Sequence, residues 1–334
     1  MRIALKALVV LLVLGLTAAF AGYRYWQLQL TAPIAVDEPV LYEVPQGAGF
    51  HSVIDQLEQQ GVLTSGWAFK LLTRIEPDRV PALKVGEYRL EPGMSGLDVL
   101  DRLASADVVT YSVTIPEGWT FEQMRKALDS AEKLSHRTAE LSNDELMTLL
   151  GRDGDNPEGR FFPDTYTYHK GVSDEAILRQ ALTRMDRLLA DLWQKRDKDL
   201  PYDTPYEALI MASLVERETG APQERGEIAG VFKRRLERGM RLQTDPTVIY
   251  GMGDRYQGNI TRSDLREETP YNTYVIDGLP PTPIALPGQA ALEAAVHPAE
   301  GDTLYFVSRG DGTHHFSRTL REHNNAVNKY ILNR

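Results

Sequence analysis

The chain has 334 residues, in which 37 lysines and arginines stand against 47 aspartates and glutamates, for a formal net charge of −10. It contains no cysteine, which excludes disulfides, thiolate metal sites and cysteine nucleophiles. The acidic balance, together with the lack of a long basic run, argues against nucleic acid as a partner.

The N-terminus carries an uncharged, mostly apolar run from Ala7 to Tyr23, preceded by the positive charges of Arg2 and Lys6. This run is about long enough to cross a bilayer. Two interpretations are open: a signal peptide with a possible cleavage site at AFA, residues 19–21, or a retained signal anchor over residues 1–26. The run exceeds the roughly 7 to 15 apolar residues of a signal peptide, which favours the anchor. Because early positive charges stay inside, we expect everything after the anchor to lie outside the cytoplasm.

The segment after the anchor, residues 27–40, is predicted to be a short spacer. Beyond it, VPQGAGFHSVIDQL from Val44 matches IPEGWTFEQMRKAL from Ile115, and a looser third copy begins at Tyr88. Each copy is typical of a strand, a proline and glycine turn, and an amphipathic helix. Residues 40–109 are therefore predicted to form a small α+β module. It resembles LysM, a fold that contacts N-acetylated glycan chains, although a packing or spacer role stays open.

The middle of the chain contains a predicted helix around residues 144–150 and then the aromatic segment EGRFFPDTYTY, residues 158–168. Its aromatic side chains have two possible roles, lining a sugar-binding groove or filling a core. A long amphipathic helix follows, with Ser173 as its N-cap.

The segment LIMASLVERETG, residues 209–220, places Glu216 and Glu218 in an otherwise apolar helix that Gly220 is expected to end. Residues two apart on a helix point about 200° apart, so these carboxylates cannot share one target. Glu218 lies on the bulkier apolar stripe and in the last turn, and both conditions raise the pKa of a carboxyl. A carboxylic acid that is protonated near neutral pH can donate to a glycosidic oxygen. The alternative is a surface glutamate on a helix that ends early.

Three downstream segments are rich in proline and glycine, and also in Gln, Asn, Thr and Tyr: residues 239–253, 269–274 and 278–288. They are predicted to be loops whose amide and hydroxyl groups suit the substituents of sugars. The sequence GMG at the end of segment 239–253 does not indicate a nucleotide site, because neither GxGxxG nor a phosphate loop accompanies it.

The C-terminal part contains a hairpin pattern, TLYFVSRGDGTHHFS, whose turn is predicted at residues 310–312. His314, His315 and His323 lie close together in the sequence. No HExxH motif occurs, so no metal site is predicted.

Several of these segments together resemble the endolytic murein transglycosylase family, the YceG-like proteins. The motifs are ASLVERET, RLQTDPTVIYGMG, YNTY, GLPPTPIALPG and EGRFFPDTY, and with the anchor they span nearly the whole chain. The resemblance implies a single-pass enzyme of the bacterial inner membrane with a catalytic domain, residues 110–334, in the periplasm. It implies cleavage of the β-1,4 bond between N-acetylmuramic acid and N-acetylglucosamine within nascent peptidoglycan strands, with no cofactor. Peptidoglycan synthases at the same membrane are the expected partners.

The resemblance also implies roles for individual residues. Glu218 matches the catalytic glutamate of the family, which first protonates the departing oxygen. It then acts as a base for the 6-hydroxyl of the muramic acid, which closes on C1 to give a 1,6-anhydro end. The expected substrate contacts are Gln243, Asp245, Tyr271, Asn272 and Tyr274.

Two other functions remain open. Ordinary glycosidases need two carboxylates, so a peptidoglycan hydrolase would recruit Asp245, Glu216 or Asp164 as its second group, and Asp245 fits best because it belongs to a loop-like segment. A non-catalytic glycan-binding scaffold would need no acid at a helix end. The expected architecture is α+β: an N-terminal membrane anchor, a small LysM-like α+β module and a mixed α+β catalytic domain.

Overall fold

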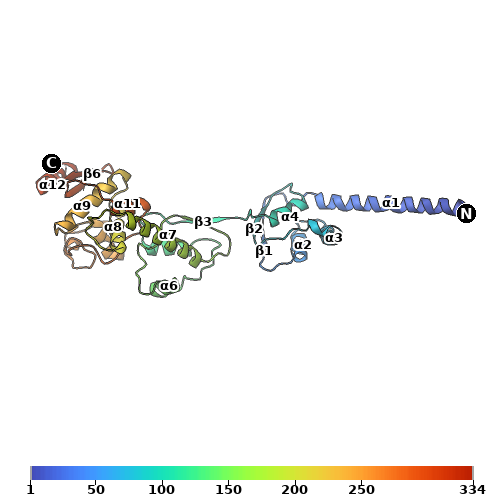
Figure 1. The fold of residues 1–334 in the computed structure, drawn as a ribbon, viewed down its shortest axis with the longest axis horizontal. Helices are drawn as coiled ribbons and strands as arrows, with labels where there is room; N and C mark the ends of the chain where they lie inside the picture. The colour runs from blue at the N-terminus through green and yellow to red at the C-terminus, as the bar shows by residue number, and fades with distance from the viewer. Residues whose placement is uncertain (1, 333–334) are drawn as a thin grey trace. The chain divides into compact units, whose positions relative to one another are not determined.

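The computed structural model describes residues 2–332 and divides into two compact units (Figure 1). Unit 1 comprises Met1–Tyr111 with Tyr168–Lys170, and unit 2 comprises Ser112–Thr167 with Gly171–Arg334. Both units combine helices with two-stranded sheets, which confirms the predicted mixture of helix and sheet.

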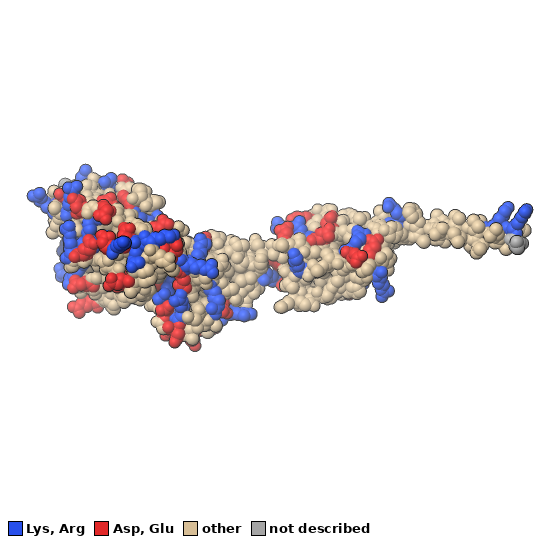
Figure 2. All heavy atoms as spheres, viewed as in Figure 1, with Lys and Arg blue, Asp and Glu red and all other residues tan. Residues whose placement is uncertain are grey.

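Unit 1 begins with helix α1 (Arg2–Thr31), which is long and apolar enough to cross a membrane. Figure 2 shows its exposed length largely free of charged side chains, with basic residues near its N-terminal end. The predicted spacer is wrong over residues 27–31, because the helix continues to Thr31. Trp26 and Leu30 are buried in the core of unit 1. They lie four residues apart, hence on one helix face, and this packing extends the helix.

The rest of unit 1 uses the strand–turn–helix pattern twice. Strand β1 (Val40–Val44) precedes α2 (Phe50–Gln59), and β2 (Gly86–Leu90) precedes α4 (Gly96–Ala104). The strands pair antiparallel, with Tyr42 opposite Tyr88. Helix α3 (Gly66–Ile75) and the short 3-10 helix η1 (Pro77–Arg79) lie between the two copies.

Unit 2 opens with β3 (Tyr111–Thr114), α5 (Phe121–Asp129), α6 (Asn143–Leu149), β4 (Thr165–Tyr168) and α7 (Asp174–Lys195), and β3 pairs with β4. Ser173 caps α7 as predicted. The aromatic segment fills a core rather than a groove: Phe161 stacks on Phe121 with ring centroids 4.8 Å apart, and Tyr166 donates to the carbonyl of Phe162. The four buried aromatic side chains are Phe161, Phe162, Tyr166 and Tyr168.

Helix α8 (Pro205–Glu218) is the central element of unit 2 and contacts α7, α9 (Arg225–Glu237), α10 (Asp245–Met252) and α11 (Gln289–Val296). A capping box between Thr204 and Glu207 starts it, with Pro205 at its first position. Its residues 208–215 are all buried. Neighbouring elements therefore cover every side of α8, as expected for a helix that is apolar all round.

The prediction that residues 239–253 form a loop is wrong in part, because residues 245–252 form α10. Thr244 at the N-cap, with Asp245 and Pro246 in the first turn, is a helix-start signal. The segments 269–274 and 278–288 are irregular, as predicted, and α11 begins directly after the second. The second packs on α8, where Ile284 N donates to Ser213 Oγ at 3.0 Å.

The chain ends in the predicted hairpin, β5 (Tyr305–Ser308) and β6 (His314–Ser317), followed by α12 (Leu320–Tyr330). Gly310 and Gly312 have φ values of 84° and 86°, which the turn requires and which glycine adopts without strain. The remaining 3-10 turns are η2 (Pro222–Glu224), η3 (Gly253–Arg255) and η4 (Asp264–Arg266).

Candidate active site

Glu218 is the last residue of α8 and lines a cavity of about 460 Å³. Gln243, Asp245 and Tyr274 line the same cavity, so the structure brings four of the predicted site residues together. The hairpin and α12 form another wall, which sequence reasoning did not foresee. The remaining lining residues are Val231, Arg235, Leu242, Leu304, Tyr305, Phe306, Val307, Ser308, His314, Leu320, His323, Val327 and Ile331.

The surroundings of Glu218 favour the protonated, neutral form of its carboxyl group. Burial raises the pKa of Glu218 to about 7, against a hydrogen bond that Thr244 Oγ1 donates to its Oε1, while the charge of Asp245 raises the pKa further. The C-terminal end of α8 adds negative potential in the same direction. At neutral pH a substantial fraction of Glu218 therefore carries a proton, as a general acid requires.

Asp245 has a different environment. It lies in the first turn of α10, where the helix dipole favours a negative charge. Tyr274 Oη donates a hydrogen bond to Asp245 Oδ1 at 2.6 Å. Burial and this contact raise the pKa of Tyr274 well above its usual range, so the phenol stays a donor. The cavity thus holds two carboxyl groups in different surroundings: that of Glu218, whose pKa is raised, and that of Asp245, which accepts a hydrogen bond from a phenol.

Gln243 is fixed by its backbone and by a buried arginine. Its φ of 52° lies in the left-handed region, which a non-glycine residue adopts only when the surroundings enforce it. Its Oε1 accepts from Arg235 Nη2 at 3.1 Å, and Arg235 Nη1 donates to the carbonyl of Leu242 at 2.6 Å. Because a guanidinium can only donate, the oxygen of the amide must face Arg235 and the NH₂ group must face away.

Arg235 and Thr244 are site residues that sequence reasoning missed. Arg235 was detectable in part, because it follows Val231 by four and Ile228 by seven residues, and so lies on the buried face of α9. A charged side chain on an apolar face needs an explanation. Thr244 carried only a helix-capping signal, and its side chain instead donates to Glu218.

Tyr271 and Asn272 do not line this cavity. Asn272 is 1% exposed, and its Nδ2 donates to the carbonyls of Asp264 and Glu267 while its Oδ1 accepts from Tyr274 N. Its amide therefore holds the loop that carries Tyr274. Tyr271 lines a second cavity, of about 870 Å³, where its ring packs edge to face on Tyr250.

The second cavity contains another buried carboxyl, Glu158, which sequence reasoning also missed. Burial raises the pKa of Glu158 to about 7. It accepts from Phe121 N at 2.9 Å and from Tyr250 Oη at 3.1 Å. These bonds link the start of α5 to α10, so Glu158 helps to hold the helix whose first residue is Asp245.

Glu216 and Asp164 are engaged elsewhere. Glu216 accepts from Gly288 N at 3.0 Å and from Arg225 Nη2 at 3.3 Å, while Asp164 pairs with Arg184. Of the three carboxylates considered as the second group of a hydrolase, Asp245 is the one that shares the cavity with Glu218. The expectation that Asp245 lies in a loop is wrong, since it begins α10.

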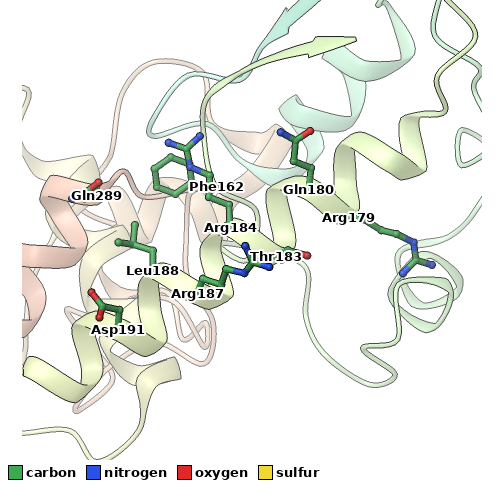
Figure 3. Close-up of a pocket in the computed structure, with 9 residues that line it drawn as sticks. All are labelled: Phe162, Arg179, Gln180, Thr183, Arg184, Arg187, Leu188, Asp191 and Gln289. Atoms are coloured by element: carbon green, nitrogen blue, oxygen red, sulfur yellow. The ribbon is translucent and has the colours of Figure 1, made fainter. Parts of the chain in front are cut away.

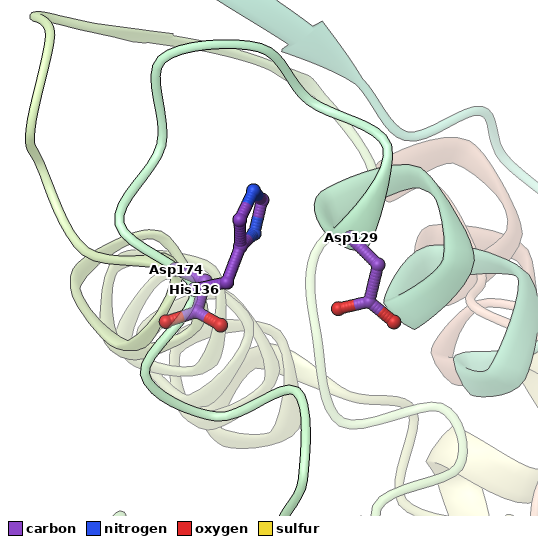
Figure 4. A group of neighbouring side chains, drawn as sticks. All are labelled: Asp129, His136 and Asp174. Carbon is purple, nitrogen blue, oxygen red and sulfur yellow. The ribbon is translucent and has the colours of Figure 1, made fainter.

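Two other groups of residues are weaker candidates for a functional site than the Glu218 cavity. A groove of about 650 Å³ is lined mostly by α7 side chains (Figure 3), and its one carboxylate, Asp191, pairs with Lys195. Asp129, His136 and Asp174 place ligand atoms within 4.8 Å of one another (Figure 4). Both oxygens of Asp174 already accept hydrogen bonds at the start of α7, from the backbone N–H groups of residues 137, 138 and 175 and from a threonine hydroxyl. This carboxylate orders the turn before the helix.

The histidines of the hairpin region have separate neighbours. His314 Nδ1 lies 2.8 Å from Glu224 Oε2, and His315 packs against Tyr330. His323 stacks on Tyr305, and burial together with Arg235 lowers its pKa. His314 and His323 contribute to the wall of the Glu218 cavity.

Comparison with known proteins identifies the family of the chain. The model of the YceG-like family matches residues 42–329. An endolytic murein transglycosylase of Bacillus subtilis (strain 168) is 30% identical over 90% of this chain and 88% of its own length. One of Streptococcus pneumoniae serotype 2 (strain D39 / NCTC 7466) is 28% identical over 98% of this chain and 65% of its own length.

A solved structure is also similar. The crystal structure described as a yceG-like protein, lmo1499, from Listeria monocytogenes has a TM-score of 0.53 and 30% sequence identity, and the match covers 87% of this chain and all of that one. The family match extends over most of both units, including Glu218 and every other residue of its cavity except Ile331. On these grounds, the chain belongs to the YceG-like family.

Proposed function

We propose that this protein is an endolytic murein transglycosylase that cleaves the β-1,4 bond between N-acetylmuramic acid and N-acetylglucosamine within peptidoglycan strands. The observation that carries the proposal is Glu218, whose pKa is raised to about 7 in a cavity that it shares with Asp245. The names of the Bacillus and Streptococcus relatives support it.

The first step is proton transfer to the bond that breaks. The protonated carboxyl of Glu218 donates to the glycosidic oxygen as the bond between that oxygen and C1 of the muramic acid lengthens. Positive charge develops on the sugar ring. Asp245 lies in the same cavity, and its carboxylate stabilises that charge, while Tyr274 fixes the carboxylate by donating to it.

The second step closes the product and restores the enzyme. The 6-hydroxyl oxygen of the muramic acid bonds to C1, and its proton passes to the Glu218 carboxylate. The product is a 1,6-anhydro end, and no water is consumed. One carboxyl serves as acid and then as base, so the reaction needs no second proton-transferring group. The raised pKa of Glu218 suits this double role.

Gln243 is the proposed contact to the sugar substituents. With its oxygen held by Arg235, its amide NH₂ group donates toward the cavity, which suits the carbonyl oxygen of an acetamido group.

Replacing Gln243 by alanine is expected to raise KM up to about tenfold with little change in kcat, since a neutral hydrogen bond contributes about 0.5–1.5 kcal/mol. Steady-state kinetics on uncrosslinked glycan strands measure both constants. The matched control is Gln289→Ala, an exposed glutamine of α11 outside the cavity. An unchanged KM, or an equal rise in the control, contradicts the contact.

The pH dependence follows from the protonation state of Glu218. Because the acid must carry a proton, kcat/KM is expected to be high below pH 7 and to fall about tenfold per pH unit above it, given a pKa of about 7. Initial rates of anhydro product formation between pH 5 and 9 test this. A profile that stays flat to pH 9 contradicts the assignment.

The effect of Glu158 on the pH dependence has to be distinguished from that of Glu218, because both groups titrate in the same range. Its folded-state pKa is also raised to about 7, so the stability that its protonated form contributes is present at low pH and is lost as the pH rises through 7. In the Glu158→Gln variant the loss of stability between about pH 4.5 and 7 should diminish, while the descending limb of kcat/KM should remain.

Product analysis by mass spectrometry tests the whole proposal. The full chain in detergent is the right material, because truncation at residue 27 removes Trp26 from the core of unit 1. Anhydro ends, one water lighter than reducing ends, support the transglycosylase. Reducing ends would indicate a hydrolase with Asp245 as its second carboxylate, and binding without products would indicate a scaffold.

We further propose that α1 is a single-pass anchor of the bacterial inner membrane, with the rest of unit 1 and all of unit 2 in the periplasm. Arg2 and Lys6 near its N-terminal end support this orientation. The two strand–turn–helix copies within residues 40–109 support a LysM-like module that binds glycan. A peptidoglycan synthase at the same membrane is the proposed protein partner, on the resemblance to the family.

A further inference from the structure

Helix α3 lies across the end of α1 rather than along it. Near the start of α3, Trp26 Nε1 donates to the carbonyl of Ala68 at 2.8 Å. Just past its end, Glu76 Oε1 accepts from Tyr23 Oη at 3.1 Å and from Gln27 Nε2 at 3.4 Å. A helix of 10 residues is about 15 Å long, whereas residues 23–27 of α1 span about 6 Å. Both ends of α3 therefore contact a stretch of α1 that is shorter than α3, as expected where two helices cross rather than run side by side.

This turn of α1 lies where the helix is expected to leave the bilayer. About 20 apolar residues cross the hydrocarbon core, and counting from Ile3 this length ends near residue 22. Tyr23, Tyr25 and Trp26 follow, and such residues concentrate at the membrane–water interface. Because α3 contacts α1 at this level, α3 lies at the level of the membrane surface when α1 spans the bilayer.

Helix α3 carries an exposed apolar stripe beside the face that packs on the core. Ala68, Phe69 and Leu72 are buried. Beside this face, Trp67 is 47% exposed and Ile75 is 49% exposed, with the partly exposed Leu71 midway between them. Spacings of four residues place these three side chains on one stripe. Trp67 also stacks on Tyr25 of α1, with ring centroids 6.3 Å apart.

We propose that α3 is an interfacial helix whose outer stripe, Trp67, Leu71 and Ile75, inserts into the headgroup region of the bilayer that α1 spans. The proposal rests on the proposed role of α1 as a membrane anchor. The occupant of the stripe is lipid, because the segment of α1 that touches α3 is the one that emerges from the membrane. Amphipathic helices of this kind bury their apolar face about 5–10 Å into the boundary between headgroups and acyl chains.

The insertion has a mechanical consequence for unit 1. An anchor through α1 alone would leave unit 1 free to turn about the helix axis. A second contact through α3 fixes which side of unit 1 faces the lipid. Arg74, exposed beside Ile75, is placed to reach anionic phosphate groups while its stem lies along the apolar surface.

Site-directed spin labelling tests the proposal on the full chain, whose lack of cysteine makes single labels simple to place. Ile75→Cys carries the test label, in vesicles of phosphatidylethanolamine and phosphatidylglycerol. Asp101→Cys is the control, exposed on α4, whose first residue donates to the carbonyl of Ala32, beyond the end of α1. Leu14→Cys reports on the anchor itself. Collision rates with oxygen and with a water-soluble nickel chelate give the depth of each label.

The expected result is a Leu14 label shielded from nickel, an Asp101 label fully accessible to it, and an Ile75 label with a nickel collision rate severalfold below that at Asp101. An Ile75 label as accessible as Asp101, with Leu14 still shielded, overturns the interfacial helix but leaves the anchor intact. A Leu14 label accessible to nickel overturns the anchor and the interfacial helix together.

A second variant tests whether the apolar stripe causes the insertion. Trp67→Ser, added to the labelled Ile75→Cys chain, should raise the nickel collision rate toward the Asp101 value. Because Trp67 is exposed, the thermal unfolding of unit 1 in detergent should change little. An unchanged collision rate in this variant overturns the role of the stripe.

Discussion

Replacement of Glu218 by glutamine is expected to lower kcat by about 10³-fold or more, since a single proton-transfer role contributes about 10²–10⁴-fold and Glu218 performs two. Glutamine keeps the size of the side chain and an oxygen that can accept from Thr244 Oγ1, so the cavity should keep its shape. The substrate Kd should change much less than kcat. Quantification of anhydro muropeptides in single-turnover and steady-state assays measures the effect.

The control for this experiment is Glu216→Gln on the same helix. Glu216 is bound to Gly288 N and Arg225 outside the cavity, so its loss should reduce stability more than turnover. If Glu218→Gln retains more than about a tenth of the wild-type kcat, the loss is too small for a general acid and the assignment fails. If the variant no longer binds glycan strands, Glu218 acts in binding rather than in proton transfer.

Local signals account for what the sequence predicted correctly. The placement of Glu218 at the end of a buried helix depends on Pro205 and the Thr204 cap at one end and on the apolar run to Val215. These are short-range features that a sequence shows directly. The hairpin turn at Gly310 and Gly312 and the Ser173 cap belong to the same class.

Long-range contacts decided what the sequence did not predict. The bond from Thr244 to Glu218 joins residues 26 apart, and the bond from Tyr250 to Glu158 joins residues 92 apart. The aromatic segment at residues 158–168 suits a core as well as a groove, and only the packing of Phe161 on Phe121 distinguishes the two. The continuation of α1 past residue 26 likewise depends on where Trp26 and Leu30 are buried.

Asp245→Asn is expected to lower kcat by about 10²-fold, as for removal of one preorganised charge-stabilising group, while the products keep their anhydro ends. Asparagine keeps the shape of the side chain and an oxygen that can accept from Tyr274 Oη, so the change removes mainly the negative charge. That charge also raises the pKa of Glu218. Without it, the descending limb of kcat/KM should move to lower pH.

The matched control is Asp254→Asn, the same substitution at an exposed residue just beyond the other end of α10, where it should alter neither kcat nor the pH profile. The products and the size of the loss of kcat distinguish the two possible roles of Asp245. A carboxylate that stabilises charge also acts electrostatically on Glu218, so in Asp245→Asn the descending limb of kcat/KM must move to lower pH. A carboxylate that positions a water nucleophile would instead be required for turnover, and the wild-type products would carry reducing ends. An unchanged kcat, or a limb that moves to higher pH, contradicts both roles, because a negative charge beside a carboxyl can only raise its pKa.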